Sequence, residues 1–142
     1  MPTAFRAATD YAFFEAWARD AGLDVARIGT GPLQHLSWLV SGRIRGRERD
    51  IALSVPEVAA PVRMHVVTQI NHIAAHSDIQ FIELSRRRCR MTVTVGLVPK
   101  SIAARLIVHS LRLSRPRLTR RLNRGLGQFA RIIAKRARHL PD

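Results

Sequence analysis

The chain has 142 residues, a length that suits one domain with its own hydrophobic core. Hydrophobic residues make up 46% of it, which excludes an intrinsically disordered chain, and the single cysteine excludes an internal disulfide or a cysteine-rich zinc site. No apolar run reaches the ~20 residues of a membrane span, and the N-terminus lacks the pattern of a secretory signal, so we expect a cytoplasmic protein.

The formal net charge of +14 is concentrated towards the C-terminus. Residues 1–111 hold 14 basic and 9 acidic side chains, whereas residues 112–142 hold 10 basic side chains and 1 acidic one. Arginine outnumbers lysine 22 to 2, which codon usage in a GC-rich genome largely explains. The arginine fork also suits phosphate and carboxylate groups, so the charge predicts an anionic partner surface.

The N-terminal half of the sequence predicts a helix followed by strands. Apolar residues at helical spacing predict a first helix within 8–25, on which Glu15 and Arg19 form an exposed i,i+4 pair. Alternating apolar residues and turn signals then predict three strands, over 33–40, over the charged segment 43–50 with its tip at Gly46, and over 51–55.

The second half predicts a helix, a hairpin and two more helices. A helix over 62–78 is expected from the apolar stripe of Val66, Val67, Ile70, Ile73 and Ala74. Strict alternation next predicts an antiparallel hairpin of two strands, over 78–84 and 89–97. Ser101 caps a third helix, whose inward face is expected to hold Ile102, Leu106, Ile107 and Leu113. A Ser-Arg-Pro start signal at 114–116 opens the last helix.

The predicted element order is α-β-β-β-α-β-β-α, followed by a basic α-helix. Such an order is typical of an α+β fold with a mostly antiparallel sheet. We expect an α+β domain over 1–113 and a basic amphipathic helical extension over 114–142.

This order resembles the YbjN-like family, which shares its fold with the chaperones of type III secretion systems. The matching segments within about 10–113 are FFEAWARDAGLDV, IALSV, QINHIAAHSDIQFIEL and CRMTVTVGL, with Asn71 in the place of an asparagine on a helix that leads into a hairpin. The resemblance implies a non-enzymatic, bacterial binding or chaperone-like module that is often dimeric. The basic charge departs from the acidic family pattern, and the extension over 114–142 has no counterpart in it.

No residue pattern in the sequence predicts catalysis, and we expect no enzyme, no cofactor and no small-molecule substrate. The acidic residues form no close pair, and the sequence has neither a nucleophile elbow nor a phosphate-loop spacing. Cys89 alternates in phase with Met91 and Val93, which predicts a buried thiol. His72 and His76 are a metal candidate on the predicted helix, but no further ligands are evident, so a solvated polar face is the preferred interpretation.

The last helix is predicted to have two faces when turned at ~100° per residue. Its apolar face, expected to dock on a partner or on the domain itself, holds Leu118, Leu122, Leu126, Phe129 and Ile133. The basic face, expected to bind anions such as nucleic acid, holds Arg117, Arg120, Arg121, Arg124, Arg131, Lys135 and Arg138. Only Arg136 intrudes on the apolar face.

Three functions are compatible with these patterns. We expect first a chaperone-like or adaptor module that engages a protein partner or forms a homodimer. The first alternative is a nucleic-acid-associated protein that contacts phosphates through the basic face. The second is a protein that binds an anionic membrane surface through the same helix.

Overall fold

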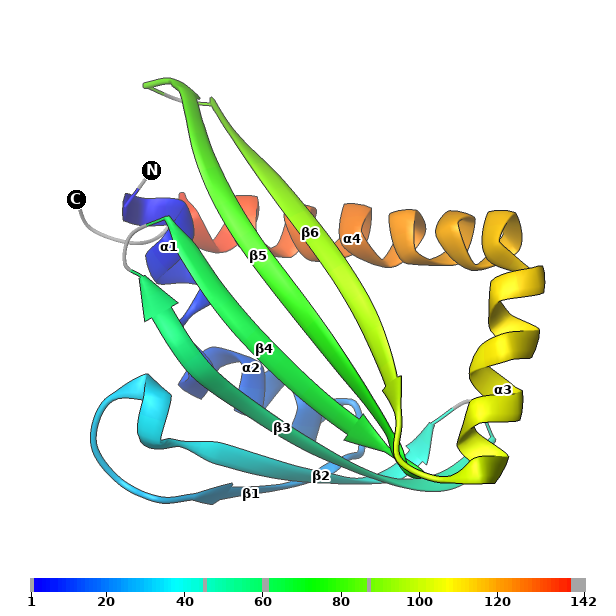
Figure 1. Cartoon of the computed structure of the whole chain (residues 1–142). Helices are drawn as coiled ribbons and strands as arrows, with labels where there is room; N and C mark the ends of the chain where they lie inside the picture. Colours follow the sequence, from blue (N-terminus) through cyan, green and yellow to red (C-terminus); the bar gives the residue numbers. More distant parts are fainter. Residues whose placement is uncertain (1, 45, 60–61, 87, 139–142) are drawn as a thin grey trace.

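The computed structural model describes residues 2–44, 46–59, 62–86 and 88–138 (Figure 1). Within these ranges the chain forms four α-helices and a six-stranded antiparallel sheet, which confirms the predicted α+β class and the helix at the C-terminus. The strands are β1 (Asp24–Ile28), β2 (Ser37–Ile44), β3 (Arg47–Ala59), β4 (Arg63–Ile70), β5 (Ile73–Ser85) and β6 (Arg88–Pro99). The helices are α1 (Pro2–Ala8), α2 (Tyr11–Asp20), α3 (Ile102–Leu113) and α4 (Arg115–Ala137), with a 3₁₀ turn η1 at Leu33–His35.

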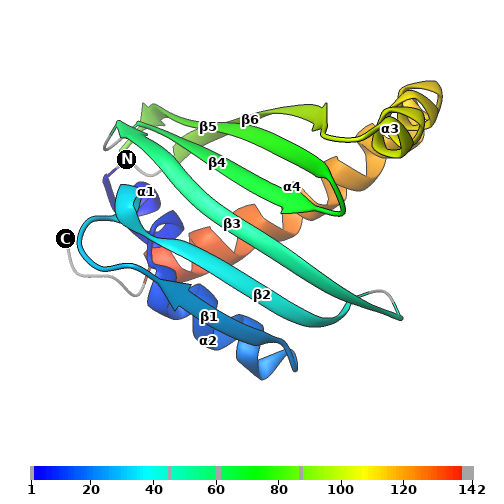
Figure 2. The ribbon, with the colours of Figure 1, turned by 60° about the horizontal axis from the view of Figure 1, so that its bottom comes forward.

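The sheet is a meander in which each strand pairs with the next strand of the chain. Helices α1, α2 and α4 lie on one face of the sheet, and α4 passes behind β5 and β6 with its first turns extending past the edge of the sheet towards α3 (Figures 1 and 2). Helix α3 stands at the edge of the molecule between the end of β6 and the start of α4 (Figure 1). One side of the sheet therefore carries the core, and α3 lies outside it.

The strands predicted around 51–55 and over 78–84 and 89–97 are present, and the last two pair as the expected antiparallel hairpin. Each is longer than predicted. The charged segment 43–50 is not a separate strand, because residues 43–44 and 47–50 form the two arms of the β2–β3 hairpin; Gly46 between them has a φ of +79°, and residue 45 lies outside the described residues. Strand β1 and helix α1 were not predicted.

The helix predicted over 62–78 is wrong, because this segment forms strands β4 and β5. Ile70 pairs with Ile73 across a two-residue turn, in which Asn71 and His72 have φ values of +47° and +65°. Positive φ at both central residues is the backbone of a type I′ turn, whose twist matches that of a β-hairpin. The asparagine that carried the YbjN-like resemblance therefore lies in a hairpin turn rather than on a helix.

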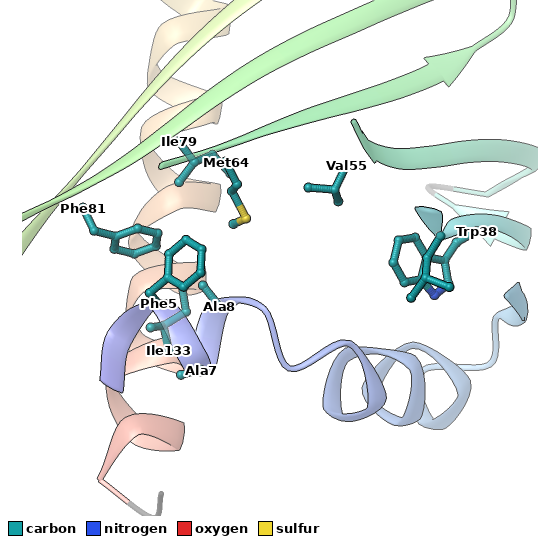
Figure 3. Close-up of a cluster of buried hydrophobic side chains, with 10 residues drawn as sticks. Phe5, Ala7, Ala8, Trp38, Val55, Met64, Ile79, Phe81 and Ile133 are labelled. Carbon is teal, nitrogen blue, oxygen red and sulfur yellow. The ribbon is translucent and has the colours of Figure 1, made fainter. Parts of the chain in front are cut away.

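Helices α1 and α4 share one hydrophobic core with the sheet (Figure 3). Phe5 of α1 meets Phe81 of β5 edge to face, with 6.0 Å between the ring centroids. Ile133 of α4 lies beside this pair and is only 5% exposed. Full burial of one such side chain contributes about 1.5–3 kcal/mol. The C-terminal helix is thus part of the fold.

A buried carboxylate joins α2 to the sheet. Glu15 accepts a hydrogen bond of 2.9 Å from the indole N–H of Trp38 and lies 3.7 Å from the Arg27 guanidinium. Arg27 in turn covers the ring of Tyr11 at 4.9 Å. The predicted pair of Glu15 with Arg19 is wrong: Glu15 faces the sheet because Trp38 offers a buried donor that needs an acceptor.

Candidate functional site

Helix α4 is held to the domain mainly by its C-terminal half. Among the predicted docking residues, Ile133 is buried and Leu118, Leu126 and Phe129 are half-buried, whereas Leu122 remains 42% exposed. The Phe129 ring stacks on Phe14 of α2 with 5.6 Å between centroids. The apolar face therefore packs on the chain's own domain. Residues 139–142 of the predicted extension lie outside the described residues.

Arg136, the one basic residue on the apolar face, is accounted for by an ion pair. Its Nε and Nη2 donate to Asp10 Oδ2 at 3.2 and 2.9 Å, and its guanidinium lies 5.0 Å from the centre of the Phe13 ring. The other oxygen of Asp10 accepts from the Phe13 amide at 3.3 Å and caps α2. One carboxylate thus both starts α2 and fixes the end of α4.

The predicted anion-binding residues lie in exposed positions along the docked helix. These are Arg117, Arg120, Arg121, Arg124, Arg131, Lys135 and Arg138. Arg131 also donates to the carbonyl of Gly127 at 3.2 Å, within its own helix. From Ile102 to Ala137 the sequence has ten basic residues and no acidic one. We call the seven exposed residues the arginine row; its last three members lie in the docked C-terminal half of α4 or directly after it, and its first four lie in the more exposed half that follows α3.

Helix α3 faces the opposite way from the prediction. Its side towards the protein holds the smaller residues Ala104 and Val108, which are 2% and 4% exposed. The large residues expected inside point to solvent: Ile102 is 81% exposed, Leu106 67%, Ile107 50% and Leu113 77%. Ser101 caps the helix as predicted, accepting from the Ala104 amide at 3.1 Å. A monomeric soluble domain rarely exposes so many neighbouring aliphatic side chains, so α3 has the character of a docking surface.

The histidines are arranged differently from the predicted metal candidate. His72 lies in the exposed β4–β5 turn, whereas His76 meets His65 across the two strands, with 3.1 Å between His65 Nε2 and His76 Nδ1. Among the described residues no group of three or more His, Cys, Asp or Glu side chains is placed to hold a metal ion. The contact of His65 and His76 could not be found by helical spacing, because it needs the strand register.

Cys89 is exposed, so the predicted burial of its thiol is wrong. It lies opposite Glu83 near the end of the β5–β6 hairpin, where neighbouring Arg88 and Arg90 are also exposed. Cys89 does lie on the same face of β6 as Met91 and Val93, as the alternation predicted. Near the β5–β6 turn, however, this face is exposed to solvent.

Arg63 and Asp78 form an exposed ion pair beside His65. Arg63 Nε and Nη2 donate to the two oxygens of Asp78 at 2.8 and 2.7 Å. The hydrogen bond from Arg63 holds the pKa of Asp78 below its usual range, with a smaller contribution from the positive charges of Arg63 and His65.

Replacing Arg63 with alanine is expected to raise the pKa of Asp78 towards the ordinary value of about 3.9. Because the folded pKa is lowered, the pair adds stability above the unfolded pKa, and this contribution is lost as the pH falls through the folded pKa. An NMR titration of the Asp78 carboxyl carbon measures the shift, and Arg90→Ala on β6 is the control. An unchanged Asp78 midpoint in Arg63→Ala would show that Arg63 does not hold the carboxylate.

No protein-family model, no curated protein and no solved structure matches the chain. None of the helices within the described ranges is long and apolar enough to cross a membrane.

Proposed function

We propose that the chain is a non-enzymatic, adaptor-like module that binds a protein partner through the outward face of α3, with the arginine row of α4 beside it. The observation that carries this proposal is the exposure of Ile102, Leu106 and Leu113 on one short helix. Location in the cytoplasm belongs to the same proposal, supported by the lone, unpaired cysteine.

Burial of the exposed α3 side chains supplies part of the free energy that a complex needs. Burying each large aliphatic side chain contributes about 1.5–3 kcal/mol, while association costs roughly 4–15 kcal/mol in lost freedom. Three aliphatic side chains alone do not offset the upper part of that cost. The arginines at the start of α4, which directly follows α3 in the chain, are also exposed, and they favour a partner with acidic groups.

Changing Leu106 and Leu113 together to glutamate is expected to abolish capture of the partner. The tagged chain, expressed in the organism that encodes it and treated with nuclease, should retain a specific polypeptide that the double variant loses. The matched control is Ile82→Glu with Leu84→Glu on β5, whose native side chains are also exposed, at 46% and 51%. If native chain and α3 variant retain the same polypeptides, or if neither retains any, α3 is not the docking surface.

A second candidate is nucleic-acid binding, which the arginine row favours. The row has no acidic neighbour on α3 or α4, and arginine contacts phosphate through paired donors. Such binding would be mainly electrostatic and would fall steeply with salt.

Removing three charges of the row is expected to weaken nucleic-acid binding and its salt dependence. For Arg117→Gln, Arg120→Gln and Arg124→Gln together, the slope of log K against log salt should become smaller in magnitude by about 2.7 on duplex DNA. The control removes the same charge from the β5–β6 hairpin, in Arg86→Gln, Arg88→Gln and Arg90→Gln. Equal loss in both variants would indicate a response to net charge and not a site on α4.

The remaining alternatives are a second copy of the chain and an anionic membrane surface. Light scattering of the purified protein tests the homodimer. Flotation with anionic and with neutral vesicles tests the membrane, because only the anionic vesicles should carry a basic helix.

A further inference from the structure

The exposed side chains of α3 follow the spacing of a helix-pairing seam. Ile102, Leu106, His109 and Leu113 are separated by four, three and four residues, and all four are exposed. This is the a/d spacing by which one helix packs along another. The seam is about 18 Å long at 1.5 Å per residue, and its four residues supply one layer of contact each.

The two edges of this seam differ in charge. Arg105 and Arg112 lie on one edge, about 70–90° around the helix from the seam, and Ala103 and Ser110 lie at a similar angle on the other. All four are exposed. In a helix pair the edge residues choose the partner by charge. On α3, only the edge with Arg105 and Arg112 is charged, so only this edge can select a partner by its charge.

The charges disfavour a second copy of the chain as the occupant. In an antiparallel pair of α3 helices, the packing of Leu106 against His109 of the second copy would bring Arg105 opposite Arg112 of that copy. A parallel pair would set side by side two α3–α4 segments that each carry ten basic residues and no acidic one. Like charges brought together in this way oppose association.

A lipid surface fits the seam less well than a helix does. The seam has no aromatic residue of the kind that anchors helices at a membrane interface, and its arginines lie on one edge only. A partner helix, in contrast, can match a one-sided row of charge.

We propose that α3 binds an acidic amphipathic helix of another protein. The apolar face of that helix covers the seam, and its acidic side chains lie against Arg105 and Arg112. This inference rests on the proposed function and names the chemistry of the partner: apolar residues at a and d positions, and glutamate or aspartate along the edge that meets the arginines.

Two designed peptides of about three heptads test the pairing, both with leucine at a and d positions. One has glutamate and the other lysine at the edge positions, so that neither pairs well with itself. By fluorescence anisotropy, the native chain should bind the glutamate peptide at least about tenfold more tightly than the lysine peptide. Arg105→Glu with Arg112→Glu should reverse this preference, and Leu106→Glu with Leu113→Glu should lose both peptides.

The matched control is Arg86→Glu with Arg88→Glu on the β5–β6 side, which changes the net charge equally and should keep the native preference. The proposal is overturned if the peptides bind alike, or if the control reverses the preference as well. If the native chain forms a homodimer that the Leu106 and Leu113 variant does not form, the seam binds a second copy of the chain. If the native chain floats with phosphatidylserine vesicles and this variant does not, the seam binds lipid. If the chain binds both peptides equally while α3 is still needed to capture a polypeptide, the proposal of an acidic helix is wrong and the proposed function stands.

Discussion

Replacing Ile133 with alanine is expected to lower the free energy of unfolding by about 2–5 kcal/mol. Ile133 is 5% exposed and packs beside Phe5 and Phe81, so the truncation leaves a cavity among residues that two helices and the sheet share. Urea denaturation followed by circular dichroism measures the loss.

Leu122→Ala is the matched control on the same helix. Leu122 is 42% exposed, so its truncation should cost about 1 kcal/mol or less. Similar losses in the two variants, or a loss below about 1 kcal/mol for Ile133, would mean that α4 does not belong to the core. The arginine row would then lie on an arm separate from the domain.

Replacing Glu15 with alanine is expected to cost about 2–3 kcal/mol, because it leaves the indole N–H of Trp38 without an acceptor in a buried site. Glu15→Gln keeps a carbonyl oxygen as acceptor and should cost less. Both values come from urea denaturation.

The indole N–H signals of the two tryptophans provide an independent readout in NMR spectra. The Trp38 signal should move strongly in Glu15→Ala, whereas the signal of Trp17, which is 53% exposed, should not. If Glu15→Ala unfolds like the native protein and leaves the Trp38 signal in place, the buried carboxylate is not a structural link between α2 and β2.

Much of the fold could be predicted from local patterns. Alternation located the β5–β6 hairpin, the cap at Ser101 located α3, and the Ser-Arg-Pro signal located the start of α4 within a residue. These features depend on neighbouring residues only. Helix α1 was missed because its contribution is tertiary: Phe5 forms the core with Phe81, far along the chain.

The segment 62–78 shows where periodicity fails. Apolar residues occur there at both helical and alternating positions, and the helical spacing was preferred. Its β-branched residues Val66, Val67, Thr68 and Ile70 favour strands, and that preference agrees with the structure. The turn between β4 and β5 contains no glycine to mark it in the sequence. Asn71 and His72 adopt the two positive φ values instead. An asparagine between two β-branched runs was the available signal.

Of the two helices that form the proposed binding surface, the sequence predicted the faces of α4 correctly and the faces of α3 incorrectly. The two faces of α4 followed from a helical wheel, because its apolar and basic residues separate cleanly, and the structure shows the apolar face docked on its own sheet. The orientation of α3 was predicted the wrong way round, because large aliphatic residues were assumed to face inward. The buried residues of α3 are the small Ala104 and Val108, and the four-three-four spacing of the outer residues was the sign of a second apolar face.

Photo-cross-linking at α3 tests most directly whether a protein covers this helix. A photoreactive amino acid at position 106, in the chain expressed by the organism that encodes it, should capture a distinct polypeptide on irradiation. The same amino acid at position 82 on β5, where the native isoleucine is 46% exposed, should not capture that polypeptide. No adduct at position 106, or the same adducts at both positions, would contradict the assignment of α3 as the docking surface.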